Sequence, residues 1–178
     1  MDKRLQQMLD HFEIRETIEA YVHGCDRGDT EAVIDCYHAD SYDHHGPLKG
    51  PGHEFAVNCL QSLRDHWNSC AHLLGQSRIR VEGDAAGAET YYFASLTRDA
   101  DGAAMLDQQI GRYIDRLERR EDGVWRIAHR LCVPDWSYSI PIGESFIDRS
   151  TFLSASRSFE DPSYEVLGLE PGRSRIWR

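Results

Sequence analysis

The sequence predicts an α+β domain in which helices pack on one face of a curved sheet of mostly antiparallel strands. Apolar residues recur at helical spacing in the first third of the chain, and from residue 70 onward the apolar period changes to two. Because the helical segments come first and the strands follow as one run, the helices are expected to cover a shared sheet. The 178 residues suit one domain. We place it at residues 1–140, with residues 141–178 as a C-terminal extension packed on the domain or on a neighbouring subunit.

Three helices are expected before the strands. The first spans residues 5–25, where apolar side chains recur at spacings of three and four: Ile14, Ile18, Tyr21, Val22 and Cys25. Gly28 ends it, and Asp29 can cap a second helix whose inward positions are Val33, Ile34 and Tyr37. Pro51 suits the first turn of a third helix. The apolar stripe of that helix is Phe55, Cys59, Leu60, Leu63 and Trp67.

Five strands are expected from alternation and turn signals. Their ranges are 41–45, 70–82, 88–98, 105–119 and 124–133. On the last strand, period two places Trp125, Ile127, His129, Leu131 and Val133 on one face and Arg126, Ala128, Arg130 and Cys132 on the other. Beyond it, Phe146, Ile147, Phe152 and Leu153 suggest a short helix. Residues 171–178 are expected to be flexible unless a partner or subunit holds them.

Composition excludes several functions. The formal net charge of -10 argues against nucleic acid and against anionic membrane surfaces, because both require clustered Lys and Arg. No apolar run approaches the roughly 18 residues that a membrane span needs. The five cysteines are widely spaced without a C-x-x-C pair, so we expect reduced thiols and a cytoplasmic protein. The first five residues carry charges without a following apolar run, so no secretory signal is expected.

Three short segments bring an acid, a base and a cation from separate parts of the chain: residues 21–26, 70–72 and 126–130. Asp26 could fix the imidazole of His72 as an acid–base pair. Tyr21 could donate its hydroxyl to a developing oxyanion, and Arg130 could face an apolar interior and bind an anionic group. The structural alternatives stay open. Asp26 could cap a turn, His72 and Tyr21 could be packed residues, and Arg130 could be solvated.

The runs Gly111–Arg120 and Gly123–Ile127 resemble the closing hairpin of the SnoaL-like branch of the nuclear-transport-factor-2-like superfamily. The resemblance covers roughly residues 8–138. It implies a cone-shaped barrel, made of a curved, mixed but mostly antiparallel sheet wrapped around the N-terminal helices.

Within that superfamily, the spacing of polar residues is similar to a group that includes scytalone dehydratase, bile-acid 7α-dehydratase and hexachlorocyclohexane dehydrochlorinase. Asp26 and His72 stand where that group has its Asp–His pair. Tyr21 matches a Tyr of the bile-acid enzyme. Cys70 and Arg130 match residues of the dehydrochlorinase, which has Lys where this chain has Tyr21. That departure argues against halide-eliminating chemistry.

The resemblance implies a lyase or isomerase that acts on a small hydrophobic, cyclic or aromatic molecule and needs no cofactor. Its catalytic residues would be Asp26, His72, Tyr21 and Arg130. The expected substrate-binding residues are Tyr42, His44, Trp67, Cys70, Tyr91, Phe93 and Arg112. No Gly-rich phosphate loop is evident, so no nucleotide cofactor is implied. The segment from His38 to His45 matches no standard metal site, so no metal is expected.

Two other functions remain open at this point. One is a polyketide-cyclase-like activity in the same fold, with Asp26 or His72 catalysing ring closure. The other is a non-catalytic ligand-binding or accessory subunit, like the small subunit of aromatic-ring dioxygenases. A homodimer or homotrimer is expected in each case, because the apolar faces of a curved sheet need cover.

Overall fold

The computed structural model describes residues 2–144, 146–148 and 150–175, and it confirms the predicted α+β class. Three helices and two short strands come first, followed by four long strands and a final short helix. In chain order these are α1 (Lys3–Arg27), α2 (Thr30–Asp35), β1 (Tyr37–His45), β2 (Leu48–Pro51), α3 (Gly52–His66), β3 (Ser69–Glu82), β4 (Ala85–Ala100), β5 (Ala103–Arg119), β6 (Trp125–Pro141) and α4 (Pro162–Leu167). The prediction therefore identified every element except β2 and α4, although most boundaries moved outward.

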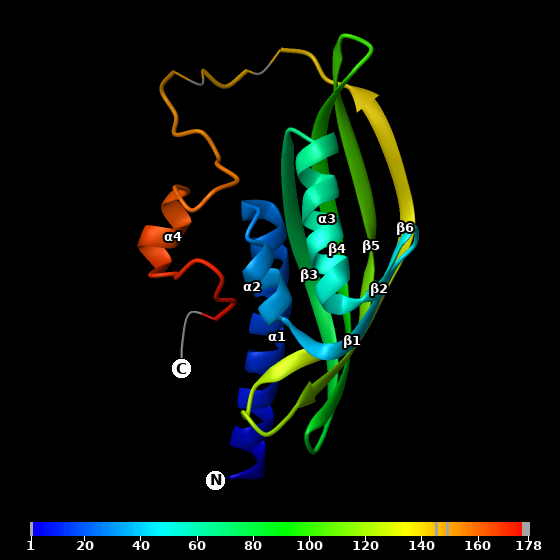
Figure 1. Ribbon diagram of the computed structural model, residues 1–178, viewed down its shortest axis with the longest axis vertical. Helices are drawn as coiled ribbons and strands as arrows, with labels where there is room; N and C mark the ends of the chain where they lie inside the picture. The colour runs from blue at the N-terminus through cyan, green and yellow to red at the C-terminus, as the bar shows by residue number, and fades with distance from the viewer. Residues whose placement is uncertain (1, 145, 149, 176–178) are drawn as a thin grey trace.

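The six strands form one mixed sheet in the order β2-β1-β6-β5-β4-β3. Only the β1–β6 pair is parallel among these strands, and the other neighbours are antiparallel. Figure 1 shows α1, α2 and α3 on one face of this long, curved sheet. The core lies between that face and the helices, and fully buried Ile14, Ile18, Leu60, Leu117 and Ile127 belong to it.

The first two helices end where local chemistry dictates. Gly28 adopts a left-handed backbone (φ 75°), which closes α1, and the Asp29 carboxylate accepts a hydrogen bond from Ala32 N at 3.0 Å to cap α2. The second helix is shorter than predicted, and Tyr37 is not part of it. The carbonyl of Cys36 accepts a bond from Ile127 N at 2.8 Å, which draws the chain into the sheet and makes Tyr37 the first residue of β1.

The face assignment for the last strand was wrong beyond Ile127, because β6 contains a bulge. Leu117 of β5 pairs with Ile127, but the preceding residue, Arg116, pairs with His129, so one extra residue lies in β6. The alternation shifts by one position there. Ile127 is buried before the bulge, and Arg130 is buried after it instead of lying on the opposite face.

The outer face of the sheet carries an unusual share of exposed apolar side chains. Trp136 is 50% exposed, Tyr138 42%, Ile140 42% and Leu73 70%. A dimer or trimer that covers this face remains a prediction, and sedimentation equilibrium tests it. Among the described residues, no helix is both long and apolar enough to cross a membrane.

The C-terminal extension runs back along the helices, and α4 lies beside α2 (Figure 1). No helix forms around Phe146 and Leu153, where both side chains are largely exposed, so that prediction was wrong. Ion pairs and hydrogen bonds hold the part of the extension around α4 against the ends of α1 and α2. Arg27 Nη1 lies 3.0 Å from Asp161 Oδ2, and Tyr164 donates to Asp29 Oδ2 at 3.0 Å.

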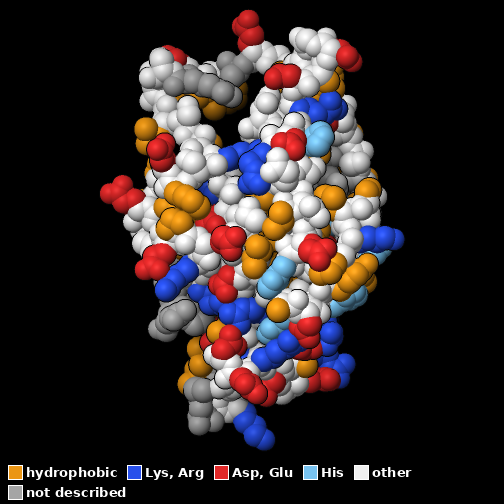
Figure 2. All heavy atoms as spheres, in the orientation of Figure 1, with side chains coloured by type: hydrophobic (Ala, Val, Ile, Leu, Met, Phe, Trp, Pro, Cys, Tyr) orange, Lys and Arg blue, Asp and Glu red, His pale blue; other side chains and the backbone are white. Residues whose placement is uncertain are grey.

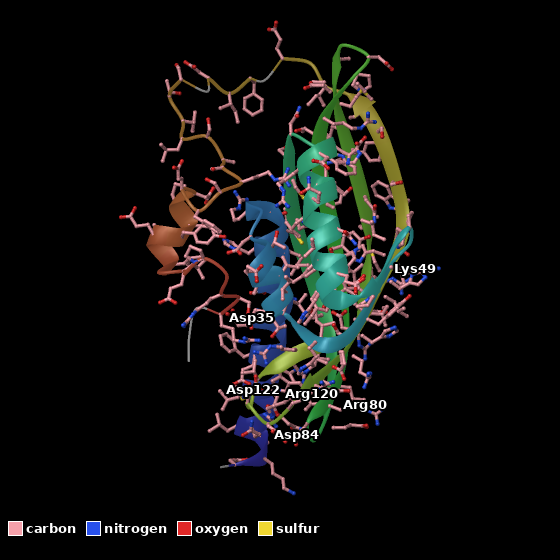
Figure 3. All side chains as sticks on the ribbon, in the orientation of Figure 1. Asp35, Lys49, Arg80, Asp84, Arg120 and Asp122 are labelled. Carbon is pink, nitrogen blue, oxygen red and sulfur yellow. The ribbon has the colours of Figure 1, made fainter. Side chains whose placement is uncertain are left out.

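The last described residues are also tied to the domain. Asp35 points from the end of α2 toward the extension (Figure 3), where Arg175 Nη1 lies 3.0 Å from its carboxylate and Ser174 donates to it at 2.6 Å. The prediction of a flexible end from residue 171 is therefore wrong for residues 171–175, and its remainder lies outside the described residues.

We expect Tyr164→Ala to loosen this extension locally. The substitution removes the bond to Asp29 and the packing of the buried ring against His23, whose ring centroid lies 5.6 Å away. Amide hydrogen exchange in residues 156–175 should accelerate by about tenfold or more, with little change in the sheet. Val166→Ala, at an exposed position of the same helix, is the control. Unchanged exchange in Tyr164→Ala would show that other contacts hold the extension.

Candidate active site

Asp26 and His72 are in direct contact. The Oδ1 atom of Asp26, in the last turn of α1, lies 2.7 Å from Nδ1 of His72 on β3. The backbone N–H of His72 donates to Oδ2 of the same carboxylate at 2.9 Å. Both carboxylate oxygens are thus engaged, which fixes the plane of the imidazole. Among the described residues, none hydrogen-bonds Nε2, so this nitrogen is left to exchange a proton with a bound molecule.

The pair is sheltered but not sealed. The side chains of His72 and Asp26 are 12% and 11% exposed. This burial keeps the pair in a medium of lower polarity than bulk water, where a charged hydrogen bond is stronger.

Cys70 completes a cluster on the inward face of β3, two residues before His72. Its Sγ lies 3.7 Å from His72 Nδ1, and burial together with Asp26 raises the pKa of the Cys70 thiol. The thiol is therefore neutral at physiological pH. Ligand atoms of Asp26, Cys70 and His72 lie within 4.8 Å of one another, so these three residues could hold a divalent metal if the thiol lost its proton.

Arg130 is completely buried and makes a bidentate ion pair. Its Nε and Nη2 donate to the two oxygens of Asp115, each at 2.7 Å. The guanidinium carbon lies over the rings of Tyr21 at 4.2 Å and Tyr113 at 4.3 Å. The third nitrogen, Nη1, is buried without a partner among the described residues. Asp115 and the two rings compensate the charge, and Nη1 remains as an available donor.

Tyr21 belongs to this second cluster. Its ring packs edge-on against Tyr37 and Tyr113, with centroids 6.0 Å and 5.7 Å apart. Burial raises the pKa of Tyr21 well above its usual value, so the hydroxyl keeps its proton. The structure thus brings Asp26, Cys70 and His72 together, and Tyr21 together with Arg130. Among the described residues, no hydrogen bond or ion pair joins the two clusters.

Five of the predicted substrate-binding residues lie on the outer side of the sheet. Tyr42 and His44 are exposed while Asp43 between them is buried, and on β4 Tyr92 faces the core while Tyr91 and Phe93 face outward. Arg112 is paired on that outer side with Glu89 at 3.2 Å. Alternation was recognised correctly in the sequence, but its phase was assigned wrongly, so these expectations are corrected.

Trp67, at the end of α3, is positioned by the carboxylate of Asp107. Its Nε1 donates to Asp107 at 3.1 Å, and Arg98 Nε donates to the same carboxylate at 2.6 Å. The bond from Arg98 lowers the pKa of Asp107 to about 2. Trp67 lies just before the start of β3, three residues before Cys70.

A second His–Asp pair was missed in the sequence. His45 Nδ1 lies 2.7 Å from Asp43 Oδ1, and Tyr37 donates to Asp43 Oδ2 at 2.6 Å. Asp43 and His45 are two residues apart on one strand, which places them on the same face and could have revealed the pair. Burial acts to lower the pKa of His45, but the bond to Asp43 outweighs it and raises that pKa to about 10. His45 is thus a permanent cation near neutral pH, unsuited to act as a base.

The pH dependence of stability should reveal this cation. Because the folded pKa of His45 is about 10 and its ordinary value is 6.5, its contribution is complete below pH 6.5 and is lost as the pH rises through 10. The difference in free energy of unfolding between wild type and His45→Gln should therefore shrink over that interval. Urea titrations at several pH values measure it, and a constant difference would contradict the assignment.

Two hollows lie beside the extension, away from the Asp26–His72 pair. One, of about 410 Å³, is lined by charged residues including Glu13, Asp35, Arg126 and Arg175. The other, of about 280 Å³, lies between α1 and α4. Neither hollow is lined by Asp26 or His72.

The comparisons with known proteins identify the family of the chain. The SnoaL-like domain matches residues 6–131, and the chain therefore belongs to the SnoaL-like family. No curated protein matches the sequence.

Solved structures match the fold over most of their length. The hexachlorocyclohexane dehydrochlorinase LinA-type3 from Novosphingobium barchaimii is 17% identical, with a TM-score of 0.69 over 82% of this chain and 99% of that one. A candidate scytalone dehydratase from Novosphingobium aromaticivorans is 16% identical, with a TM-score of 0.65 over 78% and 97%. A candidate aromatic ring hydroxylase from the same species is 23% identical, with a TM-score of 0.64 over 76% and 94%. At these identities the likeness shows the fold alone.

Proposed function

We propose that this protein is a dehydratase-like lyase or isomerase, independent of a cofactor, that acts on a small hydrophobic ring compound. The observation that supports the proposal is the Asp26–His72 pair, in which Nδ1 of the imidazole lies 2.7 Å from Asp26 Oδ1 and Nε2 has no hydrogen-bond partner in the described part of the chain. The structural likeness to a dehydrochlorinase and to a candidate scytalone dehydratase favours elimination chemistry over other uses of such a pair.

The proposed reaction needs one group that both removes and returns a proton. His72 Nε2 takes a proton from a carbon next to a carbonyl, and Asp26 stabilises the imidazolium that results. The electron pair of the broken C–H bond forms a C=C bond as the adjacent C–O bond breaks. The imidazolium then gives its proton to the leaving hydroxyl, which departs as water. No external oxidant or reductant is required.

Tyr21 and Arg130 are proposed as electrostatic stabilisers of the same reaction. Tyr21 is neutral and can donate its hydroxyl hydrogen, and Arg130 Nη1 is a buried donor without a partner among the described residues. Donors placed before the reaction at a site of developing negative charge lower the barrier without reorganising. Cys70 and Trp67 would border the substrate beside His72.

A panel of cyclic β-hydroxyketones tests the proposal. The protein should convert at least one of them to the conjugated enone, seen as new ultraviolet absorbance, and Asp26→Asn should slow that conversion by about 10²-fold or more. The rate should survive EDTA, because His72 itself carries the proton. Loss of activity in EDTA with recovery by Zn²⁺ would favour a metal at Asp26, Cys70 and His72 instead. A cyclised product from a linear polyketone would point to polyketide-cyclase-like chemistry.

A further inference from the structure

Arg157 of the C-terminal extension has a guanidinium edge that nothing satisfies. Its Nη1 donates to the carbonyl oxygens of Leu63 and Trp67, each at 3.0 Å, at the end of α3. Its Nε and Nη2 are buried and have no hydrogen-bond partner among the described residues. Buried donors of this kind are rare in proteins, and each one calls for a bound group that satisfies it.

The two unsatisfied nitrogens form the edge that binds a carboxylate side-on. Arg130 shows this geometry in the same molecule, because its Nε and Nη2 hold both oxygens of Asp115 at 2.7 Å each. An Arg fork of this kind matches a planar carboxylate better than a neutral oxygen. The chain carries a net charge of -10, so an anionic ligand needs a dedicated cation to be held here.

Arg157 is held against the ends of α1 and α3, near the elements that carry the Asp26–His72 pair. A Cβ at Gly28, two residues after Asp26, would lie 3.2 Å from the Arg157 carbonyl oxygen, so the extension touches the end of α1. The bonds to Leu63 and Trp67 hold the guanidinium just before the start of β3, the strand that carries His72. In Figure 1 the ends of α1 and α3, the start of β3 and the extension share the upper part of the molecule. Figure 2 shows the surface hollowed there, between the extension and the sheet.

We propose that Arg157 binds a carboxylate on the substrate of the Asp26–His72 site, so that the substrate is a hydrophobic organic acid. The proposal rests on the proposed function for the identity of that site. Nε and Nη2 of Arg157 are buried, so the acid reaches them only when the surrounding side chains move. The Arg157 fork then holds the carboxylate at one end while the reacting carbon lies against His72 Nε2.

Binding of benzoate, measured by titration calorimetry on the full chain, tests this assignment. Wild type should bind benzoate with a Kd tighter than about 1 mM and bind neutral benzamide at least roughly tenfold more weakly. Arg157→Gln should lose that preference. Arg157→Lys keeps the positive charge but lacks the paired Nε and Nη2 donors, so it should lose most of the preference for benzoate. This variant replaces Arg157→Gln in the test if Arg157→Gln fails to fold. The matched control is Arg173→Gln, at an exposed ion pair of the same extension, which should bind like wild type.

Several results would overturn the proposal. One is failure of wild type to bind benzoate, and another is full retention of the preference for benzoate over benzamide in both Arg157 variants. Equal binding of benzoate and benzamide by wild type would also contradict it, and would indicate that water fills the site instead. Tighter binding of phenyl phosphate than of benzoate would replace the carboxylate by a phosphate. Benzoate binding that depends on Arg157 would survive even if no lyase activity were found.

Discussion

The His72→Gln variant is expected to lose about 10²–10⁴-fold in kcat/KM while folding normally. Glutamine fills a similar volume but cannot take a proton at neutral pH. The stability cost should be small, about 0.5–1.5 kcal/mol, because one side-chain hydrogen bond is lost. The backbone bond from residue 72 to Asp26 Oδ2 remains in the variant. Steady-state rates and thermal unfolding of the same preparations measure both effects.

His66→Gln is the matched control for this experiment. His66 lies at the exposed end of α3, and its side chain hydrogen-bonds to Ser62 of the same helix. Its variant should keep the wild-type rate. A His72→Gln protein that turns substrate over as fast as wild type would remove His72 from the mechanism, and a ligand-binding or accessory role would become the better explanation.

The Arg130→Met variant is expected to lose about 3–5 kcal/mol of unfolding free energy. Met fills much of the volume between Tyr21 and Tyr113, but the Asp115 carboxylate is left buried without its cation. The double variant Arg130→Met/Asp115→Leu should recover most of the loss, because no uncompensated charge then remains. Urea-induced unfolding measures both.

Arg116→Met provides the comparison on the neighbouring strand. Arg116 is 60% exposed and pairs with Glu118 at the surface, so its loss should change stability by less than about 1 kcal/mol. A similarly small effect for Arg130→Met would mean that the Arg130–Asp115 pair is not a structural necessity of the core.

Periodicity predicted most of the fold because each element has one face in the core. The helical stripe of α1 and the alternation of β3 to β6 follow from burial alone. Periodicity could not predict where alternation changes phase. One extra residue in β6 moved Arg130 inward, and the opposite phase on β1 and β4 left Tyr42, His44, Tyr91 and Phe93 outside. Such phases are set by pairing partners that one strand does not reveal.

The site was predicted only in part, because contacts between distant segments depend on the whole fold. Asp26 and His72 were found from a resemblance in spacing, although 46 residues separate them and only the fold brings them to 2.7 Å. The Asp43–His45 pair has a local signal, since residues two apart on a strand share a face. Arg157 has none. Its position depends on how the extension folds back onto α1 and α3, which no pattern within residues 141–178 indicates.

The proposed role of His72 is tested most directly by ¹⁵N NMR of its imidazole, which shows which ring nitrogen carries the hydrogen in the neutral ring. We predict that, in the neutral ring, the hydrogen resides on Nδ1, facing Asp26, and that Nε2 shows the shift of an unprotonated nitrogen. His66→Gln should leave these signals unchanged, and Asp26→Asn should alter them. A neutral ring with its hydrogen on Nε2 would contradict the account, because His72 could then not accept a proton from a substrate at that atom.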